Sequence, residues 1–360
     1  MRSAPSRLAA TAAASAASSA LPACGPACAY RNANHDVRGQ SLARHYVLDP
    51  AQLPASALGC VVQLSLDEET RKFLESCRPR WFVDAAAGLL RSCLSVTDIN
   101  GLLGRGQMFV LSGEQAEALL GAPLAAARAA HAGVPLRLLD VGAGDGEVTA
   151  RLARLFDSVT ATEVSRVMCH RLSRRGFSVK HTARISADVF PEDGAFDVVA
   201  CMNLLDRCDF PLEMLRDAAR LTRRGTGRLL LAVVLPFSEF VEEGAGRRAV
   251  RGALPMKGAR CSDGATLEAS LAALVERVLR PLGLEIERVS RVPYLCRGDS
   301  AQPFYVLSDA VLLLRHGEEG AAGGGGVWDG TVGKAQAQAL EACDAVLLPQ
   351  ASGIRIVQRK

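Results

Sequence analysis

The stretch Leu138-Leu139-Asp140-Val141-Gly142-Ala143-Gly144-Asp145-Gly146-Glu147-Val148-Thr149 decides the fold of this chain. An apolar run ends in three alternate glycines, and a helical pattern begins directly after them. Gly142 and Gly144 allow a tight backbone turn and a close approach to a ligand, and the amino end of the next helix adds partial positive charge. The stretch therefore predicts a strand, a ligand-binding loop and a helix, although a glycine-rich turn that binds nothing has the same local pattern.

Two carboxylates accompany this loop. Asp140 precedes the first glycine, and Glu163 ends the next apolar run, where a carboxylate accepts the ribose hydroxyls of a nucleoside. The loop is Gly-x-Gly-x-Gly and lacks the Gly-Lys-Ser/Thr of a phosphate-binding loop. Both points favour S-adenosylmethionine over NAD or ATP, because that molecule presents an amino acid and a sulfonium rather than phosphates. The alternative is that both acids are simply solvated.

Strand and helix patterns alternate around the loop, which is typical of a parallel sheet covered by helices. The predicted fold class is therefore α/β and Rossmann-like, with a helical extension before the sheet. We expect strands at 136–141, 158–163, 177–180, 196–202, 227–235, 284–289 and 305–314. Helices are expected at 64–77, 81–94, 113–132, 147–156, 165–176, 211–221 and 266–282, with a turn-rich segment at 100–106.

A second polar segment follows the strand expected at 196–202. It reads Asn203-Leu204-Leu205-Asp206-Arg207-Cys208-Asp209. Ligands of such sheets bind outside the carboxyl ends of the strands, so Asn203 and Asp206 are placed to meet both a cofactor and an acceptor. Asp206 fits equally well as a helix cap.

Composition excludes several classes of protein. The net charge of +4, from 42 basic and 38 acidic residues, gives no field that would attract nucleic acid. Eleven scattered cysteines and six unclustered histidines predict neither a disulfide framework nor a metal site. No segment approaches the roughly 20 apolar residues of a membrane helix, so we expect no transmembrane span.

Six segments together resemble the DREV family, the family of methyltransferase-like protein nine. They are 99–110, 138–149, 161–165, 203–209, 235–237 and 293–299, within a resemblance that covers residues 64–315. The resemblance implies a class I S-adenosylmethionine-dependent methyltransferase fold. It also implies methyl transfer to the pros nitrogen of histidine in protein substrates with His-x-His motifs, where x is small.

The resemblance also assigns roles to residues of this chain. Asp140, Gly142 and Glu163 would bind the cofactor, together with Gly144 beneath it. Asn203 would lie where cofactor and substrate meet, as a cofactor-binding and catalytic residue, and Asp206 would be catalytic and engage the target imidazole. Tyr294 and Tyr305 would bind the substrate near the acceptor.

These observations predict four regions. They are a leader or disordered segment at 1–45, a helical region at 46–130, a methyltransferase domain at 131–316, and a Gly-rich linker and tail at 317–360. The first 35 residues contain no acid, which favours a secretory or organellar leader, whereas the scattered cysteines favour a reducing cytoplasm. The sequence does not indicate the oligomeric state.

Two alternatives to histidine methylation remain open at this point. One is a class I methyltransferase with a different acceptor, and the other is a catalytically silent scaffold that binds S-adenosylmethionine. Against the scaffold, every residue to which the motifs assign a role in cofactor binding or catalysis is present. The chain contains no His-x-His motif of its own, so we expect little automethylation.

Overall fold

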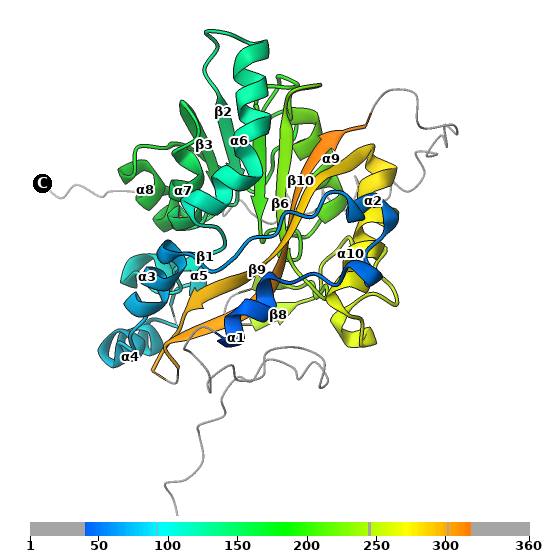
Figure 1. Cartoon of the computed structure of the whole chain (residues 1–360). Helices are drawn as coiled ribbons and strands as arrows, with labels where there is room; N and C mark the ends of the chain where they lie inside the picture. The colour runs from blue at the N-terminus through cyan, green and yellow to red at the C-terminus, as the bar shows by residue number, and fades with distance from the viewer. Residues whose placement is uncertain (1–39, 92, 244–245, 301, 318–360) are drawn as a thin grey trace, which may run out of the picture. The chain divides into compact units, whose positions relative to one another are not determined.

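A central sheet of eight strands organises the protein (Figure 1). The structure is a computed structural model that describes residues 40–317, except 92, 244, 245 and 301. The strand order is β1-β9-β10-β6-β5-β2-β3-β4. The tail predicted at 317–360 and most of the predicted leader lie outside the described residues.

Five neighbouring strands of this sheet run parallel. They are β2 (Arg137–Val141), β3 (Ser158–Glu163), β4 (Ser178–His181), β5 (Val198–Met202) and β6 (Arg228–Val234). Strand β5 and, after its first residue, strand β6 are continuous apolar runs, as expected where helices cover both faces of a sheet. The glycine loop leaves the carboxyl end of β2, the central strand of this parallel part.

Three antiparallel strands complete the sheet beyond β6. The long hairpin β9 (Leu284–Arg297) and β10 (Phe304–His316) places β10 against β6, and β1 (Met108–Phe109) pairs with β9. A separate two-stranded ribbon joins β7 (Val241–Glu243) to β8 (Gly246–Arg248). Residues from the region before the glycine loop thus form part of the same sheet.

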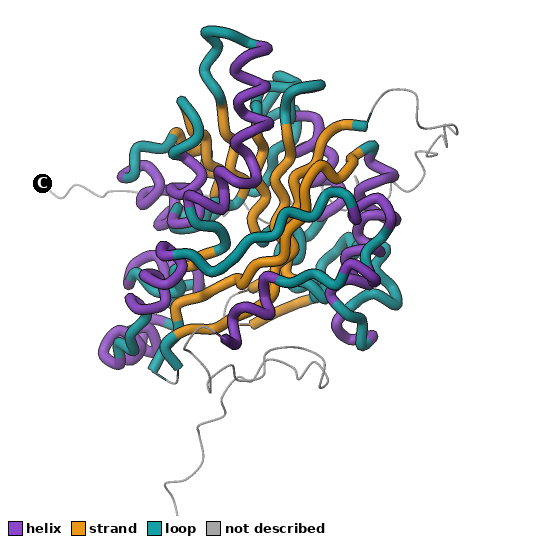
Figure 2. Tube along the Cα trace, viewed as in Figure 1, coloured by secondary structure: helices purple, strands orange, loops and turns teal. Residues whose placement is uncertain are grey.

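Helices cover both faces of the sheet, and Figure 2 shows the strands between them. Leu138, Leu230 and Leu313 pack with α6 (Gly113–Ala130) and α7 (Glu147–Ala153). Their neighbours Leu139, Leu231 and Leu312 pack with α9 (Pro211–Leu221) and α10 (Leu267–Leu274) on the other face. Alternate residues of one strand therefore face different halves of the core.

The remaining helices begin at residues suited to capping. Asp67 caps α3 (Glu68–Ser76), Ser95 caps α5 (Val96–Leu103) and Ser165 caps α8 (Arg166–Arg174), each accepting a bond from a backbone N–H. Ser112 and Gln115 form a reciprocal capping box at the start of α6. The other short helices are α1 (Gln40–Ala43), α2 (Ala55–Leu58) and α4 (Trp81–Leu90).

The structure confirms the α/β sheet and corrects three local expectations. The segment 100–106 is not a turn throughout, because α5 runs to Leu103 and ends at Gly104, whose φ is +60°. The strand expected at 284–289 continues to Arg297, and the helix expected at 266–282 passes from α10 into a π-helical turn and then a 3₁₀ turn.

The wrong prediction at 100–106 has a cause in side-chain packing. A Cβ on Gly101 would lie 2.8 Å from Cγ1 of Val167 in α8. This glycine therefore serves close contact between two helices rather than a chain reversal.

Candidate active site

The glycine loop after β2 is held against two neighbouring strand ends. The N–H of Gly142 donates to Thr162 Oγ1 at 3.2 Å, and the N–H of Ala143 donates to the Thr162 carbonyl at 3.0 Å. Gly142 has a φ of +70°, and a Cβ there would lie 3.0 Å from Leu204 Cδ1, in the loop after β5. Both the backbone angle and the close approach therefore require glycine.

Asp140 lies beneath this loop and is only 2% exposed. Its Oδ2 accepts a hydrogen bond from Thr149 Oγ1 at 2.6 Å. Its Oδ1 is buried and has no hydrogen-bond partner among the residues that the structure describes. Burial raises the pKa of this carboxyl to about 7, against the lowering effect of the Thr149 bond. The unpaired oxygen is a ready acceptor for a donor group on a ligand.

Glu163 ends β3 and is tied to the backbone around it. Its Oε2 accepts from the Gly144 N–H at 3.0 Å, and its Oε1 accepts from the N–H groups of Val164 and Ser165 at 2.7 and 2.9 Å. A carboxylate offers about four acceptor positions, so about one remains for a ribose hydroxyl. Acceptance of both hydroxyls would require Glu163 to release one backbone N–H.

Asn203, directly after β5, has an unusual backbone conformation. Its φ is +58°, the only positive φ among the described residues other than glycine. Its N–H donates to the Ala232 carbonyl at 2.9 Å, and its Nδ2 donates to Asp309 Oδ2 at 2.7 Å. Its Oδ1 is buried without a partner in the described part of the chain. The amide is therefore anchored at its nitrogen and leaves its oxygen available.

Asp206 lies three residues further on and is 1% exposed. Its Oδ2 accepts from Arg207 Nη1 at 2.5 Å, whereas its Oδ1 has no partner within the described ranges. Arg207 also donates to the Ser238 carbonyl at 3.2 Å and lies 3.9 Å over the ring of Phe240. Burial raises the pKa of Asp206 to about 6, although the Arg207 charge opposes the shift. Asp206 thus keeps one free acceptor oxygen, as a catalytic acid or base needs.

Asp309 is a site residue that the sequence reasoning missed. It lies on β10, opposite Val234 of β6 and Val292 of β9, and it is fully buried. Burial raises the pKa of this carboxyl well above its usual range, although the bond from Asn203 opposes the shift. The signal in the sequence is an acid in the middle of the apolar run 304–314.

Tyr294 lies close to the glycine loop, with the side chain of Met108 between them. Its hydroxyl donates to Met108 Sδ at 2.5 Å, and Met108 Cε lies 3.8 Å from where a Cβ on Gly144 would stand. The ring is 9% exposed, and burial raises the pKa of its hydroxyl well above the usual range. Strand β1 therefore brings Met108 between the loop and β9.

Tyr305 lies further from the loop along the hairpin. Its hydroxyl donates to Asp299 Oδ2 at 2.9 Å, and burial raises its pKa to about 12. It lines a cavity of about 180 Å³ together with Asn100, Arg105 and Arg297. The hydroxyls of Tyr305 and Tyr294 therefore bond different partners.

Four side chains at the carboxyl edge of the parallel strands share one property. Each has one buried oxygen with no partner among the described residues, and they are Asp140, Asn203, Asp206 and Asp309. Buried polar atoms in native proteins are normally bonded, so such a group marks a place where a ligand supplies donors. The cluster, with the glycine cradle beside it, fits a ligand that carries ammonium, hydroxyl or ring N–H groups.

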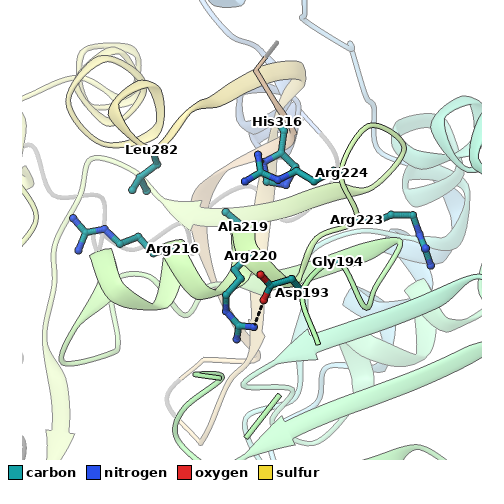
Figure 3. A pocket seen from close by; sticks show the side chains of 9 residues that line it. All are labelled: Asp193, Gly194, Arg216, Ala219, Arg220, Arg223, Arg224, Leu282 and His316. Carbon is teal, nitrogen blue, oxygen red and sulfur yellow. Dashed lines mark hydrogen bonds and ion pairs between the residues drawn. The ribbon is translucent and has the colours of Figure 1, made fainter. Parts of the chain in front are cut away.

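A different cavity lies at the opposite edge of the sheet, where β6 begins and β10 ends. It has a volume of about 540 Å³ and is lined by Arg216, Arg220, Arg223, Arg224 and His316, among others (Figure 3). One carboxylate, Asp193, accepts from Arg220 Nη1 at 2.8 Å. None of the site residues expected from the sequence lines this cavity.

The described part of the chain offers neither a metal-binding cluster nor a membrane-spanning helix. No group of three or more His, Cys, Asp and Glu side chains there is arranged to hold a metal ion. Within residues 40–317, outside the four gaps, no helix is long and apolar enough to cross a membrane.

Comparison with known proteins gives a family match and several partial relatives. The family model described as DREV methyltransferase matches residues 45–316. A ubiquinone biosynthesis O-methyltransferase of Xanthomonas oryzae pv. oryzae (strain PXO99A) is 36% identical over 103 residues, which are 27% of this chain and 43% of that protein. One from Xanthomonas euvesicatoria pv. vesicatoria (strain 85-10) is 32% identical over 166 residues, 44% of this chain and 66% of that protein. The chain thus spans about two fifths of the length of the first of these relatives.

Solved structures are similar to it at lower identity. A 1,6-didemethyltoxoflavin-N1-methyltransferase of Burkholderia thailandensis, solved with its substrate and S-adenosylhomocysteine, is 21% identical. The likeness covers 54% of this chain and 77% of that one, with a TM-score of 0.33.

Proposed function

The chain belongs to the DREV methyltransferase family, as its motifs predict, and from this membership we propose that it methylates the pros nitrogen of histidine in His-x-His segments of proteins, where x is small. S-adenosylmethionine is the methyl donor. One observation carries the histidine assignment. The buried Asp206 keeps an acceptor oxygen free, next to the segment that contacts the glycine loop through Leu204.

The acceptor chemistry suits this site. A neutral imidazole has a lone pair on one nitrogen and an N–H on the other, and histidine titrates near pH 6.5, so much of it is nucleophilic at neutral pH. The enzyme therefore needs to select the tautomer and aim the lone pair, which is catalysis by orientation. Asp206 Oδ1 would accept the N–H of the far nitrogen and so leave the pros nitrogen free to attack.

Charge is balanced in the same arrangement. The bound donor supplies an electrophilic methyl group, and transfer forms a nitrogen–carbon bond as the sulfur–carbon bond breaks. The product ring carries a positive charge, which the Asp206 carboxylate stabilises before accepting the proton of the far nitrogen. Arg207 holds the other carboxylate oxygen and so fixes the orientation of the group.

The remaining residues divide between cofactor and substrate. Asp140 Oδ1 would accept from the ammonium of the methionine part, Gly142 and Gly144 would lie beneath that part, and Glu163 would bind the ribose. Asn203 would meet both reactants. Tyr294, beside the loop, and Tyr305, in the cavity further along the hairpin, would contact the substrate peptide on two sides of the acceptor.

The test uses labelled S-adenosylmethionine with three acceptors. A His-Ala-His peptide should take up label on a pros nitrogen, and an Ala-Ala-Ala counterpart and the enzyme alone should take up little. A catechol is the third acceptor, because the partial relatives are named as O-methyltransferases. Label in the catechol but not in the His-Ala-His peptide would refute the histidine assignment. Cofactor binding without transfer to any acceptor would instead indicate a scaffold.

A further inference from the structure

We propose that Asp309 is a positioning residue that orients the Asn203 side chain, so that the Asn203 amide oxygen faces the reacting groups. The inference deepens the proposed function, on which it rests for the statement that Asn203 meets cofactor and substrate. Asp309 itself acts through Asn203 and need not touch either reactant.

The two ends of the Asn203 amide group have different hydrogen-bond partners. An asparagine side chain can turn over and exchange its donor and acceptor ends, unless one end is committed. The Asn203 Nδ2 is committed to Asp309 Oδ2 at 2.7 Å, and Oδ1 is left unpaired by the described residues. The carboxyl group of Asp309 therefore determines which end of the amide faces away from β10.

Asp309 and Asn203 are both held rigidly by the sheet. Asp309 lies within the β10 ladder, paired to Val234 on one side and Val292 on the other, and is fully buried. Asn203 has a φ of +58°, a conformation that persists only where its surroundings impose it. Its N–H bond to Ala232 and its side-chain bond to Asp309 attach it to β6 and β10, two adjacent strands.

The ionisable groups that interact with Asp309 include Asp206, Arg207, Tyr294 and Cys296. Burial keeps the pKa of Asp309 well above its usual value and so disfavours a negative charge there. In either protonation state an oxygen of this carboxyl group can accept the bond from Asn203 Nδ2. An asparagine at position 309 would present the same shape with the same acceptor.

The orientation of Asn203 can be measured directly, without reference to any acceptor. The chain contains only four asparagines, so selective ¹⁵N-asparagine labelling gives four side-chain amide signals. The signal lost in Asn203→Ala identifies Asn203. Its hydrogen exchange should be at least about tenfold slower in the wild type and in Asp309→Asn than in Asp309→Val. Equal exchange in the wild type and Asp309→Val would overturn the proposal.

Kinetics tests the same link through the reaction. Valine removes both oxygens, is only somewhat larger than aspartate in volume and suits a strand, so Asp309→Val should fold. It should lower kcat by about 10- to 100-fold, as expected for a misplaced reacting geometry, with peptide KM and the Kd for S-adenosylhomocysteine changed less than about threefold. Asp309→Asn should restore most of the lost turnover. In an Asn203→Ala background, Asp309→Val should have no further effect on kcat.

A matched control separates this role from the general cost of removing a buried acid. Asp197, at the opposite edge, is 3% exposed and accepts from the Arg137 N–H and from Arg223. Asp197→Val should lower Tm but leave kcat within about twofold. The proposal would be contradicted if Asp309→Val still lowered kcat in the Asn203→Ala background. It would also be contradicted if Asp309→Asn were as inactive as Asp309→Val. Absence of wild-type transfer to the His-Ala-His peptide would refute the proposed acceptor, and the exchange measurement would then decide the role of Asp309.

Discussion

At the scale of single residues, Asp206 is the group on which turnover should depend most. Asp206→Asn keeps the size of the side chain but replaces a charged acceptor by a neutral amide. We expect kcat to fall by about 10²- to 10³-fold, the usual range for loss of a catalytic base or an electrostatic contact. The Kd for S-adenosylhomocysteine, measured by calorimetry, should change little. Equal methyl transfer by the variant would remove Asp206 from the mechanism.

The same residue predicts a pH dependence. The pKa of Asp206 is raised to about 6, so the group protonates and loses its acceptor as pH falls through 6. The substrate imidazole also becomes protonated in this range. A plot of log kcat/KM against pH should therefore approach a slope of two on the acid side for the wild type and a slope of one for Asp206→Asn. A slope of one in both proteins would show that Asp206 does not titrate in the reaction.

Asp140 predicts a pH effect on stability rather than on rate. Its folded pKa is about 7 and its ordinary value is 3.8, so the folded state holds a proton that the unfolded chain has released between these values. The stability that this group contributes is present below pH 4 and is lost as pH rises through 7. The Tm of Asp140→Asn minus the Tm of the wild type should therefore increase by on the order of 5 °C as the pH is raised from 4 to 8. A constant difference in Tm across this range would contradict the shifted pKa.

At the scale of elements, the glycine loop should not tolerate a side chain at position 142. Gly142→Ala places a Cβ 3.0 Å from Leu204 at a positive φ, and we expect the Kd for S-adenosylhomocysteine to rise at least about tenfold. Gly133→Ala is the matched control, because Gly133 has a φ of +81° and open space around its Cα. Both variants carry the cost of the backbone angle, so a similar loss of cofactor binding in both would count against a specific cradle.

Apolar side chains pack against both faces of the sheet, so a cavity in β10 should lower the free energy of unfolding substantially. Leu312 is fully buried, and Leu312→Ala should lower the free energy of unfolding by about 2–5 kcal/mol. Leu58, in α2, is 49% exposed, so Leu58→Ala should change the free energy of unfolding by less than about 0.5 kcal/mol. Urea denaturation measures both values. Similar losses in the two variants would place Leu312 outside the core.

The sequence best predicted the bounds of those strands and helices whose own residues determine their structure. Strands β2, β5 and β6 and helix α9 are close to their expected bounds, because each is a mainly apolar or amphipathic run between turn residues. Strand β9 continued past Val289 although Ser290, Arg291 and Pro293 interrupt its apolar pattern. Pairing along β10 and β1 supplies what the local pattern lacks there.

At the scale of the whole molecule, Asp140, Glu163 and Asn203 lie at the carboxyl ends of the parallel strands, and two of the residues beside the site come from distant parts of the chain. Asp140, Glu163 and Asn203 were found because each follows a recognisable strand. Asp309 lies 106 residues after Asn203 in the chain, and Met108 lies 36 residues before Gly144. No short motif contains such pairs, so only the antiparallel strand order, which places β10 beside β6 and β1 beside β9, brings them to the site.

The late position of the β9–β10 hairpin in the chain has a consequence for biosynthesis. The ribosome makes this hairpin after all the parallel strands, yet it binds the earliest described segments: His45 Nδ1 lies 2.7 Å from Ser308 Oγ, and the Val62 N–H donates to Val289 at 2.8 Å. A nascent chain that ends after β6 has an uncovered strand edge and unpacked apolar residues such as Leu48 and Leu64, both of which favour aggregation. Premature termination in this messenger should therefore yield a polypeptide that depends on chaperones and is degraded, rather than a partly active enzyme.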